Sequence, residues 1–571
     1  MRRSGAVKPT NYMQILRSYL VNPYKKSNRI ALALTLAIIS LFIYLPGIDM
    51  PFVTTGEPRE ALVAQGMVIH NDLLQSNRYE NDLATKPPML HWSIVAFSKL
   101  IGEVNETSSR LPSVVAATVT AVAWALLLLP IVGPQRSALF FIVLSTSLEW
   151  YRNAAHSRVD MLLACFVSLA IAALYRWSRT DNSKYLLTAT LLMAGSALTK
   201  GPVGIALPIL IAAAALGLRR ELNRRMCIQL ALASAAAAIP LAAWYLTKSL
   251  SGEGSVLGIA LNENLNRLTG NMSNGDDPHE HGVLYLFGTF FTGTLPWSLL
   301  AIPALVFYAI NRRRLLKDEP TQALVHWCTS AVAVCLLLFS IPASKRGVYL
   351  LPIYPAAATL AALALHELAK EKLALTRGAA AATAAFLGFV WTVLALLRLS
   401  IFDLTSFASS PKSQAALAFY SHAFDLSEAG PKLLLQLLPV AASALCLYAI
   451  YKRGSSALHA FGMVFAFYLV FIKLDLIKPA AIELSPKSFI AMEIRDHSPL
   501  ELSLANSRMY GEAFYIRQLN PKLKVSEYSG GSNYVLLWAR DRGLIPEPRY
   551  LHESNKAIDK PDRRLEFAIV N

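Results

Sequence analysis

Apolar stretches of about twenty residues alternate with short polar and basic segments over most of the chain. A helix needs about twenty apolar residues to cross the ~30 Å hydrocarbon core of a bilayer. The repetition therefore predicts an all-α polytopic membrane protein. Thirteen transmembrane helices are predicted, near 30–48, 112–131, 137–150, 160–176, 185–199, 202–217, 227–249, 283–309, 322–341, 348–366, 378–398, 431–451 and 456–476.

Two regions depart from this pattern. In the loop 49–111, residues 57–70 and 88–100 have amphipathic helical spacing, which predicts two helices at the membrane interface. After residue 478 the composition becomes that of a soluble protein, and short β-type runs at 534–539 and 565–570 predict a small α/β domain. The predicted divisions are an N-terminal segment 1–29, a transmembrane domain 30–478 and a C-terminal domain 479–571.

Lys and Arg side chains gather in alternate loops, as they do on the cytoplasmic side of membrane proteins. With the N-terminal segment in the cytoplasm, the loop 49–111, the loop 250–282, the turn 342–347 and the C-terminal domain all lie outside. These outer segments also hold most of the unusual polar residues. The polar cluster is therefore predicted to face the non-cytoplasmic side of the membrane.

Composition supports the same class of protein. The chain is 54% hydrophobic and 16% charged, which excludes an ordinary soluble domain. Its net charge of +17 is explained by the basic loops, and no basic stripe with stacking aromatics indicates nucleic-acid binding. The five cysteines lie within or beside apolar segments, so no disulfide framework is predicted.

The first outer loop carries a carboxylate and two cations in Glu57-Pro58-Arg59 and Lys86-Pro87. Fixed positive charge at Arg59 and Lys86 suits a reaction in which a lipid phosphate leaves, because it stabilises the charge that develops on that phosphate. The alternative is that both side chains reach the interface only to contact lipid headgroups.

Further polar residues lie at the outer ends of later spans. Asp160 begins one span, where an acidic group is costly unless it lines a polar cavity; a structural pair with Arg158 or Arg152 is the alternative. The remaining candidates on this face are Lys200, Lys345 and Tyr349.

The loop 250–282 contributes Arg267 and a run of carboxylates around His279 and His281. A metal site is one interpretation, although the spacing matches no established signature, and a solvated polar loop is the other. No phosphate-binding glycine loop or hydrolase motif indicates nucleotide-dependent or serine-hydrolase chemistry.

The order of these elements resembles the protein-mannosyltransferase-like superfamily of GT-C glycosyltransferases, and most closely the bacterial aminoarabinose lipid A transferases. The resemblance runs nearly end to end. It rests on Glu57-Pro58-Arg59, Lys86-Pro87, Asp160, Thr199-Lys200-Gly201, Glu263, Arg267, His279, Leu295-Pro296-Trp297, Lys345 and Tyr349.

The resemblance implies an inverting glycosyltransferase that uses a sugar carried on undecaprenyl phosphate. It implies catalytic roles for Glu57, Asp160 and Lys86. It implies substrate binding by Arg59, Lys200, Arg267, Lys345 and Tyr349. The implied acceptor is a lipid A-type phosphate or another envelope group; a protein or glycan hydroxyl is the alternative, and a lipid-linked sugar transporter is the alternative from another class.

Two positions depart from the family pattern. Gly56 stands where the family usually has Asp, and Thr85 stands where a metal-contacting Glu is common. Only His279 remains of the pair that contacts metal in the aminoarabinose transferases, so the sequence identifies no certain cofactor. A phosphate acceptor is already anionic and needs no general base, so the missing Asp favours a phosphate acceptor.

Overall fold

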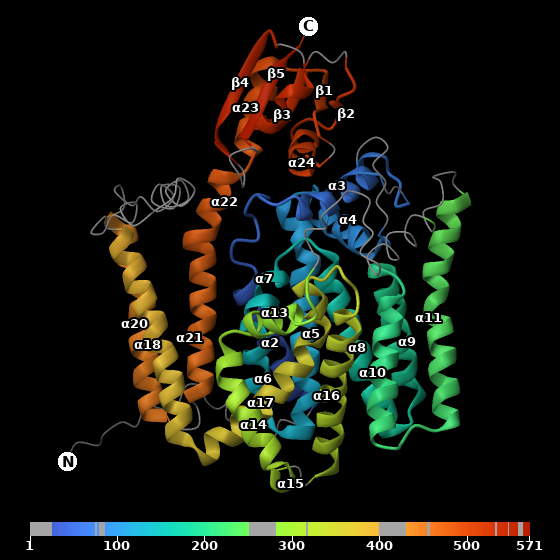
Figure 1. The fold of residues 1–571 in the computed structure, drawn as a ribbon, viewed down its shortest axis with the longest axis vertical. Coiled ribbons are helices and arrows are strands. Elements are labelled where there is room, and N and C mark those ends of the chain that lie inside the picture. The colour runs from blue at the N-terminus through green and yellow to red at the C-terminus, as the bar shows by residue number, and fades with distance from the viewer. Residues whose placement is uncertain are drawn as a thin grey trace, which may run out of the picture.

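The structure is a computed structural model of the 571-residue chain. It describes residues 26–74, 77–78, 86–250, 258, 281–315, 318–398, 430–453, 457–506, 508–530, 534–545, 548–557 and 564–570. A bundle of helices makes up most of the molecule, and a small α/β domain stands on one end of it (Figure 1). The predicted fold class, an all-α bundle of apolar helices with a small C-terminal α/β domain, is confirmed.

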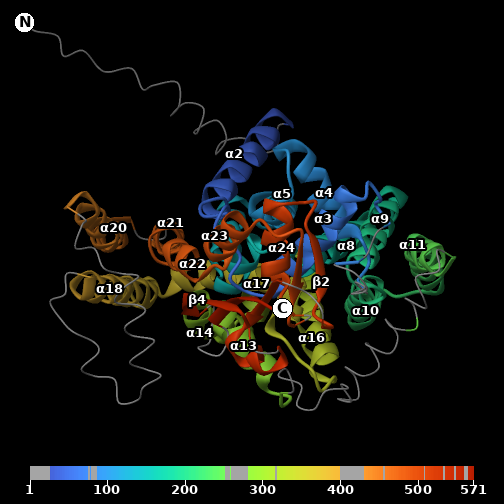
Figure 2. The same cartoon turned by 90° about the horizontal axis from the view of Figure 1, so that it is seen from above.

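The bundle is built from helices whose apolar sequences match the predicted spans. Its elements are α2 Lys26–Tyr44, α5 Glu106–Val132, α6 Pro134–Thr146, α7 Leu148–Ala154, α8 Val159–Thr180, α9 Ser183–Lys200, α10 Val203–Leu218, α11 Arg224–Leu250, α13 Tyr285–Gly293, α14 Trp297–Ile310, α15 Arg312–Leu315, α16 Glu319–Ser340, η1 Gly347–Ile353, α17 Tyr354–Glu371, α18 Leu373–Arg398, α20 Gly430–Arg453, α21 Ala457–Ile472, η4 Lys473–Ile477 and α22 Lys478–Leu484. Seen from above, α18 and α20 lie at one edge of the bundle and α11 at the opposite edge (Figure 2).

Each predicted span overlaps one or more helices in the described residues, but these helices differ in length. Seven described helices are long and apolar enough to cross a membrane, or up to eight if a bent pair is one span. That pair is α13 and α14, which meet at 107°. The sequence predicted one span at 283–309, and Pro296 lies at the break because proline lacks the N–H that would continue the helix. The predicted span 137–150 is likewise divided, between α6 and α7.

Helix starts are fixed by local capping. Asn105 caps α5 through a reciprocal pair of hydrogen bonds with Ser108. Asp318 caps α16 by accepting from the Thr321 N–H. In the first loop, α3 (Gly56–Ile69) and α4 (Met89–Ile101) form where the sequence predicted two amphipathic helices. They lie at the end of the bundle, beneath the C-terminal domain (Figure 1).

The C-terminal domain contains one five-stranded sheet of order β2-β1-β3-β5-β4. Its elements are α23 Lys487–His497, β1 Glu501–Leu504, α24 Tyr510–Leu519, β2 Lys524–Glu527, β3 Tyr534–Trp538, η5 Ala539–Leu544, β4 Tyr550–Ala557 and β5 Arg564–Ile569. Strand β1 pairs in parallel with β2 and β3, whereas β5 pairs antiparallel with β3 and β4.

Helix α24 joins this domain to the first loop. The Phe52 N–H donates to the Tyr515 hydroxyl at 2.7 Å, and that hydroxyl donates to Glu106 at 3.1 Å. Gln65 of α3 donates to the Phe514 carbonyl at 3.3 Å. Tyr515, Glu106 and Gln65 bring polar side-chain atoms into this buried joint, and Phe52 and Phe514 contribute backbone atoms, so each contact satisfies an atom that has lost water. The C-terminal domain therefore fixes the position of α3.

Candidate active site

Helix α3 begins at Gly56, and its first carboxylate points into the protein. Glu57 is buried, and both of its oxygens bind Arg110, at 2.8 and 3.0 Å. The Ser157 N–H donates a third hydrogen bond at 3.0 Å. Burial raises the pKa of Glu57, but the charges of Arg110 and His156 and the hydrogen bonds from Arg110 and Ser157 together outweigh burial and lower the pKa to about 2. Glu57, for which the sequence predicted a catalytic role, is thus an anion in a buried ion pair.

One helical turn after Glu57, Glu60 binds the charged side chains of the first outer loop. Lys86 Nζ lies 2.5 Å from Glu60 Oε1, and Arg59 donates to the same oxygen at 2.8 Å. His91 Nε2 of α4 lies 3.1 Å from Glu60 Oε2. Glu60 and His91 are buried, whereas Arg59 and Lys86 are partly exposed. Glu60 therefore holds Arg59 and Lys86 in place at the edge of the protein interior.

The charges of this cluster shift the pKa values of its members. Burial would raise the pKa of Glu60, but Lys86 and Arg59 outweigh it and hold the pKa well below its usual value. Burial lowers the pKa of Lys86 to about 8, although the negative charges of Glu60 and Asp160 act in the opposite direction. Glu60 is thus an anion at neutral pH, and Lys86 is a cation that loses its proton more easily than an ordinary lysine.

Asp160 and Lys200 form a second pair close to the first. Lys200 Nζ of α9 donates to Asp160 Oδ1 of α8 at 2.6 Å. The same ammonium group lies 4.4 Å from the centre of the Tyr349 ring, within the range of a cation–π contact. The sequence placed these three residues on one face, and the structure brings them together. The sequence alternative of an Asp160 pair with Arg158 or Arg152 differs from the structure, where Arg152 instead binds Glu149.

Arg158 lies against the first residue of α3. A Cβ atom at Gly56 would be 1.8 Å from Arg158 Nη2 and 2.5 Å from its Cζ, so the guanidinium fills the space that any side chain at position 56 would need. Burial lowers the pKa of Arg158; Asp160 opposes this lowering, and the nearby charges of Arg346 and Arg59 add to it. Arg158 and Arg346 therefore belong to the same electrostatic neighbourhood as Glu60 and Asp160.

The other proposed residues have different positions. Lys345 is buried and donates to the carbonyls of His281 and Ala343, at 2.8 and 3.4 Å, so its ammonium group is bound by backbone. Arg267 and His279 lie outside the described residues. Within the residues that the structure describes, no group of three His, Cys, Asp or Glu side chains could hold a metal ion.

Sequence reasoning did not assign roles to Glu60, His91 or Arg158. Glu57 and Glu60 are three residues apart and lie on the same side of one helix, so spacing alone does not tell which of them binds Arg59 and Lys86. Arg110, which is more than fifty residues away from Glu57 in the sequence, binds Glu57. Glu60 is then the carboxylate that binds Arg59 and Lys86. The sequence signal for the position of Arg158 is Gly56, directly before Glu57-Pro58-Arg59, because a glycine can mark a position where another group comes close to the backbone.

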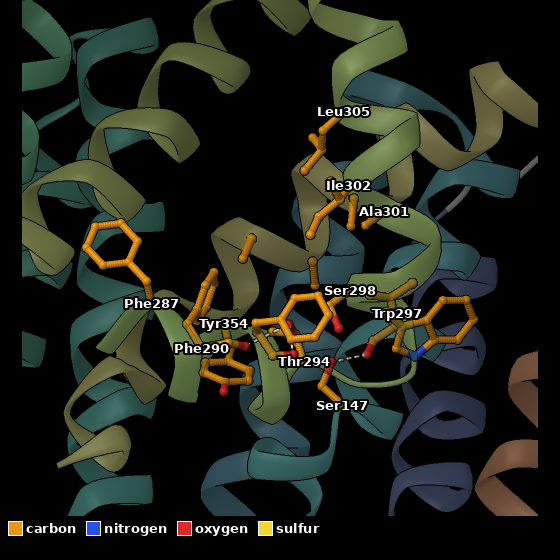
Figure 3. Close-up of a pocket in the computed structure, with 15 residues that line it drawn as sticks. Ser147, Phe287, Phe290, Thr294, Trp297, Ser298, Ala301, Ile302, Leu305 and Tyr354 are labelled. Carbon is orange, nitrogen blue, oxygen red and sulfur yellow. Dashed lines mark hydrogen bonds between the residues drawn. The ribbon is translucent and has the colours of Figure 1, made fainter. Parts of the chain in front are cut away.

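A separate apolar cavity of about 220 Å³ lies between α13, α14 and α17. Figure 3 shows its lining: the side chains of Ile302 and Leu305 lie toward one end, and Ser147, Thr294 and Tyr354 toward the other. It begins at the bend between α13 and α14 and follows α14 for about two turns, so it extends into the apolar part of the bundle. Such a lining suits a hydrocarbon chain.

Comparison with known sequences gives one family and one relative. The family described as dolichyl-phosphate-mannose-protein mannosyltransferase matches residues 85–244, which include Lys86, Asp160 and Lys200. An uncharacterised protein of Aquifex aeolicus is 28% identical over 318 residues, which are 55% of this chain and 58% of the relative. The matched part of the chain thus spans little more than half of the relative's length.

Comparison with solved structures gives a likeness over the whole chain. The structure of ArnT from Cupriavidus metallidurans bound to undecaprenyl phosphate has a TM-score of 0.71 and 17% identity, covering 95% of this chain and 98% of that protein. The same protein in the apo state gives 0.69 and 18%, covering 94% and 97%. The resemblance to GT-C glycosyltransferases of the ArnT type is confirmed in the fold.

Proposed function

We propose that this multi-pass membrane protein is an inverting glycosyltransferase that takes a sugar from a polyprenyl-phosphate carrier. The observation that carries the proposal is the pairing of Lys86 and Arg59 with Glu60, next to the Lys200–Asp160 pair, on one end of a GT-C fold. The resemblance points to undecaprenyl phosphate as the carrier and to an aminosugar as the group transferred. The proposed location is a bacterial inner membrane, with this end of the bundle facing the periplasm.

The donor phosphate is assigned to Arg59, Lys86 and Lys200, with Tyr349 beside Lys200. Glu60 and Asp160 hold these cations before the substrate arrives, so they need little rearrangement when charge develops on the leaving phosphate. Arg267 and Lys345 are also proposed to bind substrate, because they match cations of the family. Lys345 acts by donating a hydrogen bond to the His281 carbonyl. In this scheme Glu57 keeps α3 in place through Arg110, and Glu60 is the carboxylate of the first loop that positions the phosphate-binding cations.

The acceptor is proposed to be a phosphate of the lipid A type. A general base works best when its pKa is near the working pH, and the pKa of Glu60 is held well below its usual value. A phosphate oxygen needs no base: it attacks the anomeric carbon, the bond from that carbon to the carrier phosphate breaks, and the electron pair leaves with the carrier phosphate. A protein or glycan hydroxyl acceptor, the alternative, would have to lose a proton to Asp160.

The isoprenoid chain of the donor is assigned to the apolar cavity between α14 and α17. The cavity is lined by Phe, Ala, Ile and Leu side chains over much of its surface and has hydroxyl groups at one end. Burial of hydrocarbon there would contribute binding energy far from the reacting bond, which an enzyme can use to hold the sugar in its reactive position.

Proteoliposomes with a radiolabelled undecaprenyl-phosphate sugar test the function. Covalent transfer of label to lipid A supports the phosphate acceptor, and transfer only to a hydroxyl compound supports the alternative acceptor. Movement of label across the membrane without a new bond supports a transporter and contradicts the enzyme. Lys86→Met, with the exposed Lys99→Met as its matched control, shows whether the measured activity belongs to this site.

A further inference from the structure

Gly56 and Arg158 make a contact that depends on the absence of a side chain. The atoms closest to a Cβ at position 56 all belong to the Arg158 guanidinium, at 1.8, 2.5 and 3.0 Å. Real Cβ atoms do not come so near to other atoms, so even alanine would push the guanidinium away. Because these atoms are the end of a flexible side chain, a side chain at position 56 would displace the guanidinium and leave the backbone of α3 in place.

The cations of the site fall into two groups. Arg59, Lys86 and Lys200 each have a carboxylate partner, Glu60 or Asp160. In the described part of the chain, the Arg158 and Arg346 side chains have no ion pair and no hydrogen bond. Among the described residues, Glu60 and Asp160 are thus already paired with three cations, and Arg158 is left without an ion pair. A partly buried guanidinium without a partner is costly unless an anion completes it.

We propose that Arg158 forms a second anion subsite that binds the phosphate group of the acceptor. The proposal rests on the proposed function, since it identifies the side chains that would recognise the acceptor of that reaction. Donor and acceptor phosphates would then bind to different cations: the donor to the paired group and the acceptor to Arg158.

Two features favour a phosphate at this subsite. The guanidinium of Arg158 presents parallel N–H donors that match two phosphate oxygens. It also lies over the N-terminal end of α3, where Thr55 makes no side-chain capping bond and the helix dipole adds positive charge. A carboxylic side chain at position 56 would remove both features, because it would displace the guanidinium and place negative charge at the subsite. In this chain, Gly56 therefore leaves the space in which the Arg158 guanidinium lies.

Binding measurements on the full-length protein in nanodiscs separate the two subsites. The three probes are undecaprenyl phosphate, lipid A with its phosphates, and lipid A from which phosphatase has removed them. For the wild type we expect tighter binding of phosphorylated than of dephosphorylated lipid A. Arg158→Gln should weaken binding of phosphorylated lipid A by about tenfold or more and leave undecaprenyl phosphate within about twofold. Arg158→Lys should restore part of the loss.

Gly56→Ala tests the same subsite without removing the arginine, and it should lose the preference for phosphorylated lipid A in the same way. Matched controls are Arg152→Gln, an exposed arginine paired with Glu149, and Gly217→Ala, a helical glycine with open space around it. Both controls should bind all three probes as the wild type does.

Three results would overturn the proposal. The first is an unchanged preference for phosphorylated lipid A in both Arg158→Gln and Gly56→Ala. The second is an equal loss of both phosphate probes, which would assign Arg158 to the donor. The third is inorganic phosphate binding the wild type as tightly as lipid A, which would make this a site for free anions. Failure of the proposed function is distinct, because it would appear as wild type that does not bind undecaprenyl phosphate.

Discussion

The carboxylate of Glu57 is bound on both oxygens by the guanidinium of Arg110, and both side chains are buried. Removing one partner of such a pair leaves an uncompensated buried charge, which costs ~3–5 kcal/mol. Glu57→Gln should therefore lower the melting temperature clearly while the folded fraction keeps most of its turnover. Thermal unfolding and single-turnover transfer measure the two effects, with the exposed Glu103→Gln as control. Lost turnover at an unchanged melting temperature would contradict a structural role for Glu57.

Lys86 is expected to contribute to catalysis and little to folding. Its ammonium group is partly exposed and paired with Glu60, and loss of one charge-assisted contact to a phosphate costs ~1.5–3 kcal/mol. Lys86→Met should reduce kcat/KM by about tenfold to a hundredfold, with little change in expression. Steady-state kinetics with a purified donor measure this reduction, and equal kinetics of the variant and wild type would show that Lys86 lies outside the reaction.

The pH dependence of kcat/KM should report the same residue. The pKa of Lys86 is lowered to about 8, and only the protonated form is a cation. Phosphate binding by Lys86 is therefore fully available below this pH and is lost as pH rises through it, so kcat/KM should fall above about pH 8. Lys86→Arg keeps its charge at higher pH and should remove this alkaline limb. Rate profiles from pH 6 to 10 test the assignment, which an identical limb in both proteins would refute.

The apolar cavity should distinguish long carriers from short ones. Ala358 is a small buried residue in its lining, so Ala358→Phe fills part of the cavity. We expect kcat/KM to fall for a donor with eleven isoprene units and to change much less for a donor with two or three. Leu299→Phe on the same bundle is the control, because Leu299 is 52% exposed on the outer surface. Equal losses for both chain lengths would argue against a chain in this cavity.

The orientation in the membrane is open to direct labelling. Arg313 is exposed on α15 and Lys522 is exposed in the turn before β2, and these two elements lie at opposite ends of the molecule (Figure 1). The positive-inside rule puts Arg313 in the cytoplasm. In a Cys227→Ser background, which removes the exposed native cysteine, an impermeant thiol reagent on spheroplasts should label Lys522→Cys and spare Arg313→Cys. The reverse result would place the site on the cytoplasmic side.

The positions of the helices and part of the site could be predicted from the sequence. The length of an apolar stretch and the distribution of Lys and Arg between loops can both be read from short segments of the chain. Lys200 and Asp160 were expected on one face and form an ion pair. The sequence could not show which of Glu57 and Glu60 binds Lys86, since this depends on Arg110 and Lys86 reaching α3 from other parts of the chain. The same holds for Lys345, whose partners are backbone carbonyls that no motif records. Spacing also cannot show a bend such as that between α13 and α14.

The joint between Phe52 and Tyr515 has a consequence for the order in which the protein is made. The two residues are 463 positions apart, so a ribosome adding ~5–20 residues per second needs roughly 25 to 90 seconds to supply the second after the first. During that time the first loop has left the ribosome without the hydroxyl that later accepts from its backbone. The contacts of α3 and the first loop with the C-terminal domain then form only when translation is nearly finished. A nascent chain that already contains every helix of the bundle would hold α3 through Glu57 and Arg110 alone among these contacts, and the joint would become complete with the last tenth of the polypeptide.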